Sequence, residues 1–167
     1  MQGFQIASLP VAGGELGLCP IPGRGGDYAG DLAAILDWRP GLVLTMTTVA
    51  ELAAVGASAL GSDLGRAGVD WRHLPVADLG AGSPALTQGW PEASAAALAV
   101  LGVGGKVLAH CFGGCGRSGM AVLRLMVEAG ELADPALARL RDVRPCAIET
   151  DEQLAWAAQP MWGRLRG

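Results

Sequence analysis

Hydrophobic and polar positions along the chain group into short apolar runs and longer amphipathic or alanine-rich stretches that follow one another in turn. The short runs, bounded by turn residues, predict strands at Phe4 to Ala7, Glu15 to Cys19, Leu42 to Thr47, Val69 to Leu74 and Lys106 to Ala109. The longer stretches predict helices at Asp31 to Trp38, from a capping-box spacing at Thr48 and Glu51, at Thr87 to Leu101, at Ser118 to Ala129 and from Asp134-Pro135. This order predicts an α/β fold with a mostly parallel central sheet, helices on both faces and a ligand at the carboxyl end of the central strand.

Length and charge narrow the possible classes of protein. The 167 residues, 51% of them hydrophobic, suit a single domain over residues 1–167, since neither a linker nor an internal repeat interrupts the pattern. The net charge of −4 and the lack of a basic run argue against nucleic acid or an anionic membrane as a partner. The sequence does not open on a charged leader with a long apolar core, and no apolar stretch is long enough to span a bilayer. We therefore expect a cytoplasmic protein.

The stretch from His110 to Gly119, with the sequence HCFGGCGRSG, carries the most distinctive chemistry of the chain. Cys111 and Arg117 stand at the two ends of five residues, three of which are glycines, so the backbone can curl and aim successive N–H groups at one point. A helix predicted directly after this loop adds positive potential, which favours a bound phosphate and the thiolate of Cys111. The planar fork of Arg117 can hold two phosphate oxygens. The stretch therefore predicts a phosphate-binding loop with a built-in nucleophile.

This stretch resembles the signature loop of the cysteine-dependent protein tyrosine phosphatase superfamily, which reads His-Cys, five residues, Arg and then Ser or Thr. The resemblance implies that Cys111 attacks phosphorus to form a phosphocysteine, while Arg117 binds the phosphate oxygens. It also implies that Ser118 donates a hydrogen bond to the sulfur and that His110 orients and polarises the loop. The other phosphate ligands would be the loop amides of Phe112, Gly113, Gly114, Cys115 and Gly116. Such a mechanism requires no metal and no other cofactor.

A proton donor for the leaving group is expected on a second segment. The stretch from Trp71 to Pro84 resembles the general-acid loop of the compact dual-specificity branch, because an apolar strand leads into Pro-Val-Ala-Asp and a glycine-bearing loop that ends in proline. The resemblance implies that Asp78 protonates the leaving oxygen and later takes a proton from the attacking water. The alternative is that Asp78 is only a turn residue, as most loop aspartates are.

The stretch from Arg144 to Gln153 is a further point of resemblance. Similar segments in the dual-specificity group lie beside the signature loop, where the glutamine can position the hydrolytic water. Gln153 also has a structural explanation, because Thr150 and Gln153 have the spacing of a helix capping box, and the two interpretations are compatible. Taken together, these stretches look most like the kinase-associated phosphatase (cyclin-dependent kinase inhibitor 3) subgroup.

The four cysteines form neither a disulfide framework nor a zinc-binding pattern. We therefore expect free thiols in a reducing compartment, with Cys111 the most readily oxidised and with Cys19 and Cys146 as packed thiols. Cys115 departs from the family pattern, and it could trap an oxidised Cys111 as a disulfide.

The residues of the loop also bear on the choice of substrate. Apart from Arg117 the loop holds no basic residue, which disfavours a multiply phosphorylated inositol lipid and favours a phosphorylated protein or another phosphomonoester. Without an evident insertion to deepen the pocket, we expect a dual-specificity phosphatase that accepts phosphotyrosine and phosphoserine or phosphothreonine. Two alternatives of other classes remain, namely a catalytically silent phosphoprotein-binding module and a thiol redox or sulfur-transfer protein that uses Cys111 and Cys115.

Overall fold

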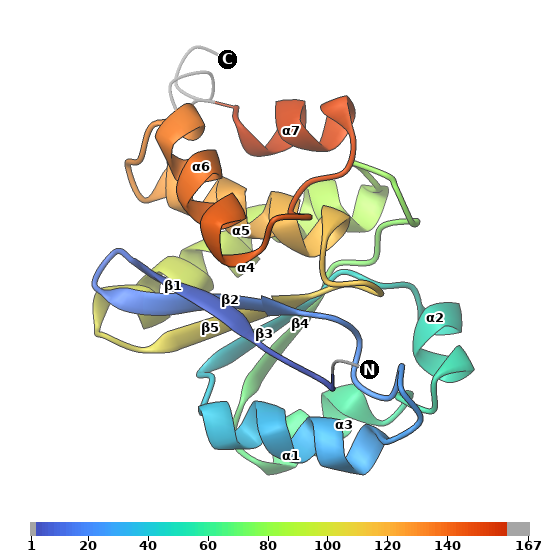
Figure 1. Ribbon diagram of the computed structural model, residues 1–167. Helices are drawn as coiled ribbons and strands as arrows, with labels where there is room; N and C mark the ends of the chain where they lie inside the picture. The colour runs from blue at the N-terminus through green and yellow to red at the C-terminus, as the bar shows by residue number, and fades with distance from the viewer. Residues whose placement is uncertain (1–2, 160–167) are drawn as a thin grey trace.

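The computed structural model describes residues 3–159, and residues 1–2 and 160–167 lie outside the described part of the chain. The described residues form one five-stranded sheet in the order β1-β2-β5-β3-β4 (Figure 1). The strands are β1 (Ala7–Val11), β2 (Gly14–Cys19), β3 (Leu42–Thr45), β4 (Asp70–His73) and β5 (Lys106–His110). Strand β1 runs antiparallel to β2, and the other neighbouring strands are parallel. The predicted α/β fold with a mostly parallel sheet is confirmed.

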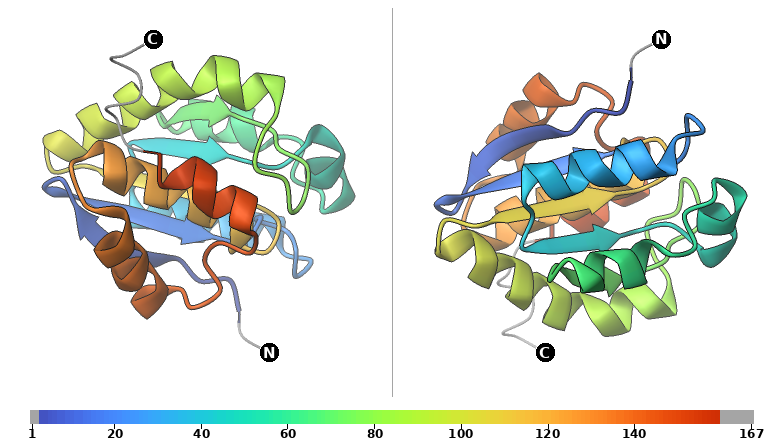
Figure 2. Two further views of the ribbon diagram at one scale, coloured as in Figure 1. Left: turned by 90° about the horizontal axis from the view of Figure 1, so that it is seen from above. Right: turned by 90° about the horizontal axis from the view of Figure 1, so that it is seen from below.

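Helices cover both faces of the sheet (Figure 2). One face packs against α1 (Tyr28–Trp38) and α3 (Leu60–Arg66), and the other packs against α4 (Pro84–Gly102), α5 (Gly116–Glu128) and α6 (Ala133–Val143). Helix α7 (Asp151–Ala157) packs on α5, on the side away from the sheet (Figure 1). Successive side chains of a strand point to opposite faces, so each strand supplies both layers of the core. In β5, Leu108 packs with α1 and α3, whereas Val107 and Ala109 pack on the other face. The apolar runs of the sequence are therefore strands that are buried on both sides.

Several elements begin at residues other than those the apolar pattern predicts, and β1 and α6 (Ala133–Val143) are two of them. The first strand is Ala7–Val11 rather than Phe4 to Ala7, because a tight turn at Ala12 and Gly13 pairs it with β2. These turn residues have φ angles of 53° and 90°, which suit the right-handed twist of a hairpin and set its register. The helix expected from Asp134-Pro135 begins one residue earlier, at Ala133, and Asp134 lies in its first turn. In the first case the turn geometry, rather than the run of apolar residues, decides where the strand lies.

Strand β5 lies at the centre of the sheet, and its neighbours β2 and β3 both run parallel to it. The carboxyl ends of these strands and of β4 therefore meet at one edge of the sheet, where the loops that follow them gather. The short helix α2 (Val49–Ala54) follows β3 at this edge. The chain leaves β5 at His110 and enters α5 at Gly116, so the signature residues form a strand-to-helix loop there. Because α5 is buried along most of its length, this loop is anchored on rigid elements.

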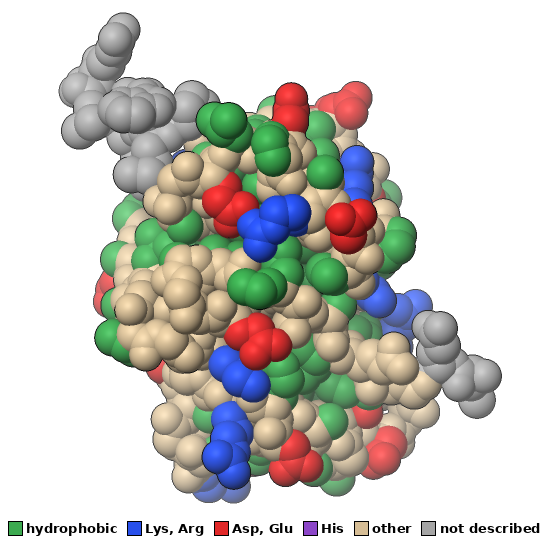
Figure 3. Space-filling view, turned by 60° about the vertical axis from the view of Figure 1, so that its left-hand side comes forward, with side chains coloured by type: hydrophobic (Ala, Val, Ile, Leu, Met, Phe, Trp, Pro, Cys, Tyr) green, Lys and Arg blue, Asp and Glu red, His purple; other side chains and the backbone are tan. Residues whose placement is uncertain are grey.

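The described surface shows charges of both signs. On the face drawn in Figure 3, basic and acidic side chains lie among one another and among apolar ones. No helix of residues 3–159 combines the length and the apolar character needed to cross a bilayer.

Candidate active site

The first half of the loop after β5 is held from outside by two neighbouring loops. The carbonyl oxygen of His110 accepts a hydrogen bond from Met46 N at 3.0 Å, in the loop that follows β3. The carbonyl oxygen of Phe112 accepts from Ile21 N at 3.1 Å, in the loop that follows β2. Both contacts exist because the carboxyl ends of the parallel strands share one edge of the sheet.

The second half of the loop is held by the segment between α6 and α7. Arg144 donates from Nη2 to the carbonyl oxygen of Gly113 and from Nε to that of Gly114, both at 2.9 Å. The carbonyl oxygen of Cys115 accepts from Ile148 N at 3.1 Å. Arg144 and the backbone amide of Ile148 thus hold the three consecutive carbonyl groups of residues 113–115 on the outside of the loop.

These outward contacts determine where the amide groups of the loop point. In a trans peptide the N–H lies opposite the preceding carbonyl, and the described residues contain no cis peptide bond. The carbonyl of Cys111 is also occupied, because it faces His110 Nδ1 at 3.3 Å. With the carbonyls of residues 111–115 engaged on the outside, the N–H groups of residues 112–116 face the inside of the curl. Together with the N-terminus of α5, they make a site that suits an oxyanion.

The candidate nucleophile lies at the start of this curl. Cys111 is a free thiol and only 2% exposed. Its Sγ lies 3.2 Å from Oγ of Ser118, in the first turn of α5. A hydroxyl at this distance can donate a hydrogen bond to the sulfur. The structure thus brings these two predicted site residues together.

Arg117 is buried, and hydrogen bonds hold one side of its guanidinium group. Its Nη1 and Nη2 donate to the two carboxylate oxygens of Glu51 at 2.8 and 2.7 Å, and Nη1 also donates to the carbonyl oxygen of Val76 at 2.8 Å. These bonds use both N–H groups of Nη1 and one of Nη2. Nε and the second N–H of Nη2 lie side by side on the other edge of the planar fork. That edge has the geometry to hold two oxygens of a phosphate.

Asp78 lies next to this arginine. It belongs to the loop between β4 and α4, and its Oδ1 is 3.4 Å from Nη2 of Arg117. Its side chain is 72% exposed, so the carboxylate is open to solvent. Oδ1 also accepts from Leu79 N at 3.0 Å, and Leu79 takes a positive φ of 61° that turns the loop. The structure therefore places a carboxylate at the open side of the predicted phosphate site.

Glu51 is a residue of this site that sequence reasoning missed. The sequence pattern assigns it only to a capping box, and that box is present, since Thr48 N donates to Glu51 Oε2 at 2.8 Å and Glu51 N donates to Thr48 Oγ1 at 3.3 Å. The same carboxylate also holds Arg117, whose hydrogen bonds lower the pKa of Glu51 to about 2 against the opposing effect of burial. No local pattern reveals this second contact, because the two residues are 66 positions apart.

His110 is fully buried beneath the loop. Burial lowers the pKa of His110 to about 4, so the ring is neutral at neutral pH. The carbonyl of Cys111 can only accept, so Nδ1 carries the proton, and Nε2 accepts from Thr45 Oγ1 at 2.7 Å. Trp71 Nε1 donates to the same hydroxyl oxygen at 2.7 Å. His110 therefore fixes the peptide group of the nucleophile, which is the geometry that an orienting role requires.

Gln153 is buried where three segments meet. Its Oε1 accepts from Glu149 N at 2.9 Å, and its Nε2 donates at 3.1 Å to the carbonyl of Gly80, in the same loop as Asp78. A Cβ atom at Gly116 would lie 2.9 Å from Nε2, so the amide packs against the first residue of α5. Only half of the expected capping box forms, because Gln153 N donates to the Thr150 hydroxyl at 3.1 Å while the side chain turns to Glu149.

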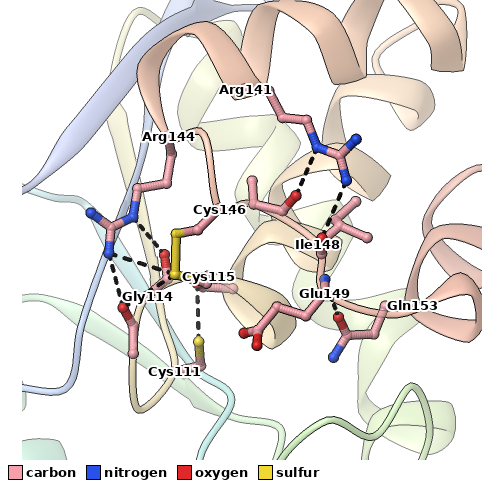
Figure 4. Close-up of a disulfide and its surroundings, with 12 residues drawn as sticks. Cys111, Gly114, Cys115, Arg141, Arg144, Cys146, Ile148, Glu149 and Gln153 are labelled. Atoms are coloured by element: carbon pink, nitrogen blue, oxygen red, sulfur yellow. Dashed lines mark hydrogen bonds between the residues drawn. A yellow bond between two sulfur atoms is a disulfide. The ribbon is translucent and has the colours of Figure 1, made fainter.

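Cys115 and Cys146 form a disulfide, shown in Figure 4. The expectation of four free thiols is therefore wrong, as are a packed thiol at Cys146 and a free Cys115 that could trap Cys111. The cause is tertiary, because the segment after α6 folds onto the outside of the loop and brings two Cα atoms 31 positions apart to within 5.2 Å. Cys19 is a free and fully buried thiol, as expected, and burial raises its pKa well above the ordinary value.

A cleft of about 610 Å³ opens beside the loop, between Gly113 and the N-terminal segment at Phe4. Arg24 and Asp27 both line it. The guanidinium of Arg24 lies 5.2 Å from the ring centroid of Phe112, the residue that follows the nucleophile. The rim of the site therefore has a cation that the loop sequence itself does not supply, with an acidic side chain nearby.

The positive charge of the site can be traced to protein groups of the described residues. Among residues 3–159, no group of three or more His, Cys, Asp or Glu side chains is placed to hold a metal ion. Positive potential comes instead from Arg117 and from the amides at the start of α5.

No model of a known protein family matches the sequence, and neither does any curated protein. Solved structures do match. Kinase-associated phosphatase, with its catalytic-site cysteine replaced by serine, matches with a TM-score of 0.80 and 23% identity, over 94% of this chain and 93% of that chain. Tk-PTP in its active form matches with a TM-score of 0.68 and 25% identity, over 90% of this chain and 92% of that chain. PTPMT1 in complex with PI(5)P matches with a TM-score of 0.71 and 19% identity, over 90% of this chain and 92% of that chain.

The chain therefore has the fold of the protein tyrosine phosphatases. Its structural neighbours include dual-specificity and tyrosine phosphatases, and the kinase-associated phosphatase is among them. The resemblance predicted from the signature loop is confirmed at the level of the fold.

Proposed function

We propose that the chain is a metal-independent phosphomonoesterase that works through a phosphocysteine at Cys111. The observation that carries this proposal is the meeting, on one loop, of a buried free thiol, inward-facing amides and a guanidinium with one edge available. The fold supports it, because the kinase-associated phosphatase is described with a catalytic-site cysteine.

In the first step the sulfur of Cys111 attacks phosphorus, and the bond from phosphorus to the leaving oxygen breaks. The phosphoryl oxygens face the loop amides and the open edge of Arg117, which stabilise the charge of the transition state. Asp78 donates a proton to the leaving oxygen. The distance of 3.4 Å between its Oδ1 and Nη2 of Arg117 supports this role, because a phosphate bound by this arginine would lie near the carboxyl group.

In the second step water attacks the phosphocysteine, and the sulfur leaves. Asp78 takes the proton of the water, while Ser118, 3.2 Å from the sulfur, donates a hydrogen bond to the departing thiolate. We assign the positioning of the water to Gln153, because its amide lies between the loop of Asp78 and the first residue of α5.

Phosphorylated proteins are the proposed substrates, with phosphotyrosine and phosphoserine or phosphothreonine all accepted. PTPMT1 is described with an inositol lipid, but a second phosphate group in the cleft of this chain would meet Asp27 as well as Arg24. This balance of charge favours a single phosphate with a largely neutral leaving group.

Hydrolysis of para-nitrophenyl phosphate and phenyl phosphate in the presence of a chelator tests the mechanism. Cys111→Ser is expected to abolish turnover while binding phosphate, because the site keeps its amides and Arg117. Asp78→Asn is expected to lower kcat about 100-fold for phenyl phosphate and less for para-nitrophenyl phosphate, whose leaving group needs little protonation. The matched control is Asp142→Asn, which removes another exposed carboxylate and should leave both rates unchanged.

Other outcomes would overturn the proposal. Wild-type protein that binds phosphate without hydrolysing either ester would instead be a binding module. Activity that survives Cys111→Ser, or that vanishes in chelator, would exclude a phosphocysteine without a metal.

A further inference from the structure

The half of the loop that follows Gly113 is attached to one segment of the chain, residues 144–148. Arg144 holds the carbonyls of Gly113 and Gly114, Ile148 N holds that of Cys115, and the disulfide joins Cys115 to Cys146 (Figure 4). These carbonyls belong to the peptide groups whose N–H atoms face the inside of the curl. Segment 144–148 therefore sets the direction of the proposed phosphate ligands.

The segment depends on outside contacts to keep its own shape. Arg141, near the end of α6, donates from Nε to the carbonyl of Ala147 at 3.0 Å and from Nη2 to that of Ile148 at 3.2 Å. Ile148 has a φ of +67°, in the left-handed region that a β-branched residue rarely adopts. Such a conformation costs free energy and persists only where surrounding contacts impose it. A covalent bond to Cys146 is therefore well placed to keep the segment on the loop.

We propose that the disulfide between Cys115 and Cys146 is a clamp that positions the phosphate loop, closed by oxidation and opened by reduction. This inference rests on the proposed phosphatase function. Arg144 and Ile148 remain as non-covalent contacts when the clamp opens, so reduction loosens the loop and weakens phosphate binding without abolishing it. Cys146 acts through Cys115 and is a positioning residue.

The chemistry of opening needs a dithiol as reductant. One thiolate of the dithiol attacks Sγ of Cys146, which belongs to an exposed residue, and Cys115 leaves with the electron pair of the S–S bond and takes up a proton. The second thiolate of the reductant then displaces Cys146, which leaves as a thiol once protonated. The protein gains two electrons and two protons, and the dithiol leaves as a cyclic disulfide.

Pairing with Cys146 also changes what can happen to the nucleophile. While Cys115 is bonded to Cys146, it cannot form a disulfide with Cys111, so an oxidised Cys111 has no free thiol in its own loop to react with. Opening the clamp returns that thiol. The clamp therefore links the binding of phosphate to the redox state of a residue outside the loop.

The test compares one protein in two redox states. Peptide mapping without reductant should recover Cys115 joined to Cys146, with Cys111 as a free thiol. Dithiothreitol should then raise KM for para-nitrophenyl phosphate and the inhibition constant of inorganic phosphate together, about 3- to 10-fold, which is less than the loss of a whole oxyanion donor would cause. Reoxidation with glutathione disulfide, with phosphate bound to shield Cys111, should restore both values.

Two variants separate positioning from other effects of the reductant. Cys146→Ser should have the higher KM and the higher inhibition constant of phosphate both with and without dithiothreitol. Any remaining response of this variant to dithiothreitol should come only from reduction of an oxidised Cys111. Pro145→Ala alters the neighbouring exposed residue, keeps the disulfide and should respond like wild type. Hydrogen exchange provides a readout independent of activity, because the amides of residues 112–116 should exchange faster after reduction.

The outcomes distinguish this inference from the function beneath it. Hydrolysis that depends on Cys111 but is the same in both redox states would overturn the clamp and leave the phosphatase proposal standing. Oxidised wild type no more active than Cys111→Ser would overturn the phosphatase proposal, and the exchange rates would then decide the clamp alone. A mapped disulfide between Cys111 and another cysteine would also overturn the clamp.

Discussion

Arg117 and Glu51 face each other through two parallel hydrogen bonds, of 2.8 and 2.7 Å, between groups 66 positions apart in the sequence. The carboxylate binds the edge of the guanidinium formed by Nη1 and Nη2 and leaves the edge formed by Nε and Nη2 for other partners. It also caps α2, so the start of that helix and the candidate phosphate site share one side chain.

Glu51→Gln should impair both activity and stability. The amide keeps the shape of the side chain but loses the charge, so Arg117 becomes a buried cation with a weaker partner. We expect kcat/KM for para-nitrophenyl phosphate to fall about 10- to 100-fold because the guanidinium is less well oriented. The free energy of unfolding in urea should fall by about 1–3 kcal/mol, below the cost for a fully buried pair because Glu51 is partly exposed.

The matched control for this variant is Glu131→Gln, which breaks an ion pair with Arg139 at the surface. It should change stability by less than about 1 kcal/mol and leave kcat/KM unchanged.

Acid should mimic the Glu51 variant, because a pKa lowered from 4.5 to about 2 gives stability that is present above pH 4.5 and lost as the pH falls toward 2. Equal kcat/KM values for wild type and Glu51→Gln would contradict the positioning role.

His110 should make stability depend on pH in a higher window. Burial lowers its pKa from 6.5 to about 4, so between these values the unfolded chain binds a proton that the native state excludes. Stability therefore rises with pH through the window, and acidification from pH 6.5 toward 4 should remove up to about 3 kcal/mol. Urea unfolding of wild type and His110→Asn, measured above pH 4.5, checks this, because the variant should lack that part of the slope.

His73→Gln is the control for this measurement, since it alters the other histidine of the chain, which contacts the carbonyl of Thr47. It should keep the slope that His110 produces. If the slope disappears in His73→Gln and persists in His110→Asn, the pH dependence does not come from His110 and the prediction is wrong.

Gly114→Ala should disrupt the loop. Gly114 has a φ of +73°, and an added Cβ would lie 2.6 Å from the backbone carbon of Cys19 and the nitrogen of Pro20. Backbone strain and this clash together should lower the free energy of unfolding by about 2–4 kcal/mol and abolish phosphate binding. Gly113→Ala is the matched control, because its Cβ would meet only Arg24 Nη1, at 3.5 Å. Equal losses of stability in the two variants would contradict the close approach of Gly114 to β2.

Gln153→Leu should slow the second chemical step. The variant leaves the amide of Glu149 and the carbonyl of Gly80 without their partner, which should cost about 1–3 kcal/mol of stability. If the amide also positions water, the phosphocysteine accumulates, and rapid mixing with para-nitrophenyl phosphate should show a burst of product before a slower steady state. Unfolding at a lower urea concentration without such a burst would mean that Gln153 has only a structural role.

The local part of the candidate site could be predicted from sequence. Cys111, Arg117 and Ser118 lie within eight consecutive residues, and the apolar run before them and the helix after them determine a strand-to-helix loop. The positions of β2, β3 and β5 follow from apolar runs, because strands buried on both faces need such runs. These features depend on neighbouring residues, so the order of residues determines them.

Only the tertiary structure decided the long-range partners. The sequence placed Glu51 in a capping box and Cys146 among packed thiols, but parallel strand order brought the first to Arg117, and the fold-back after α6 brought the second to Cys115. A residue type and its spacing can specify what one segment does alone. Which distant segment packs against it depends on the burial of the whole core. Packing of the core therefore determines both the contact of Glu51 with Arg117 and the disulfide between Cys115 and Cys146.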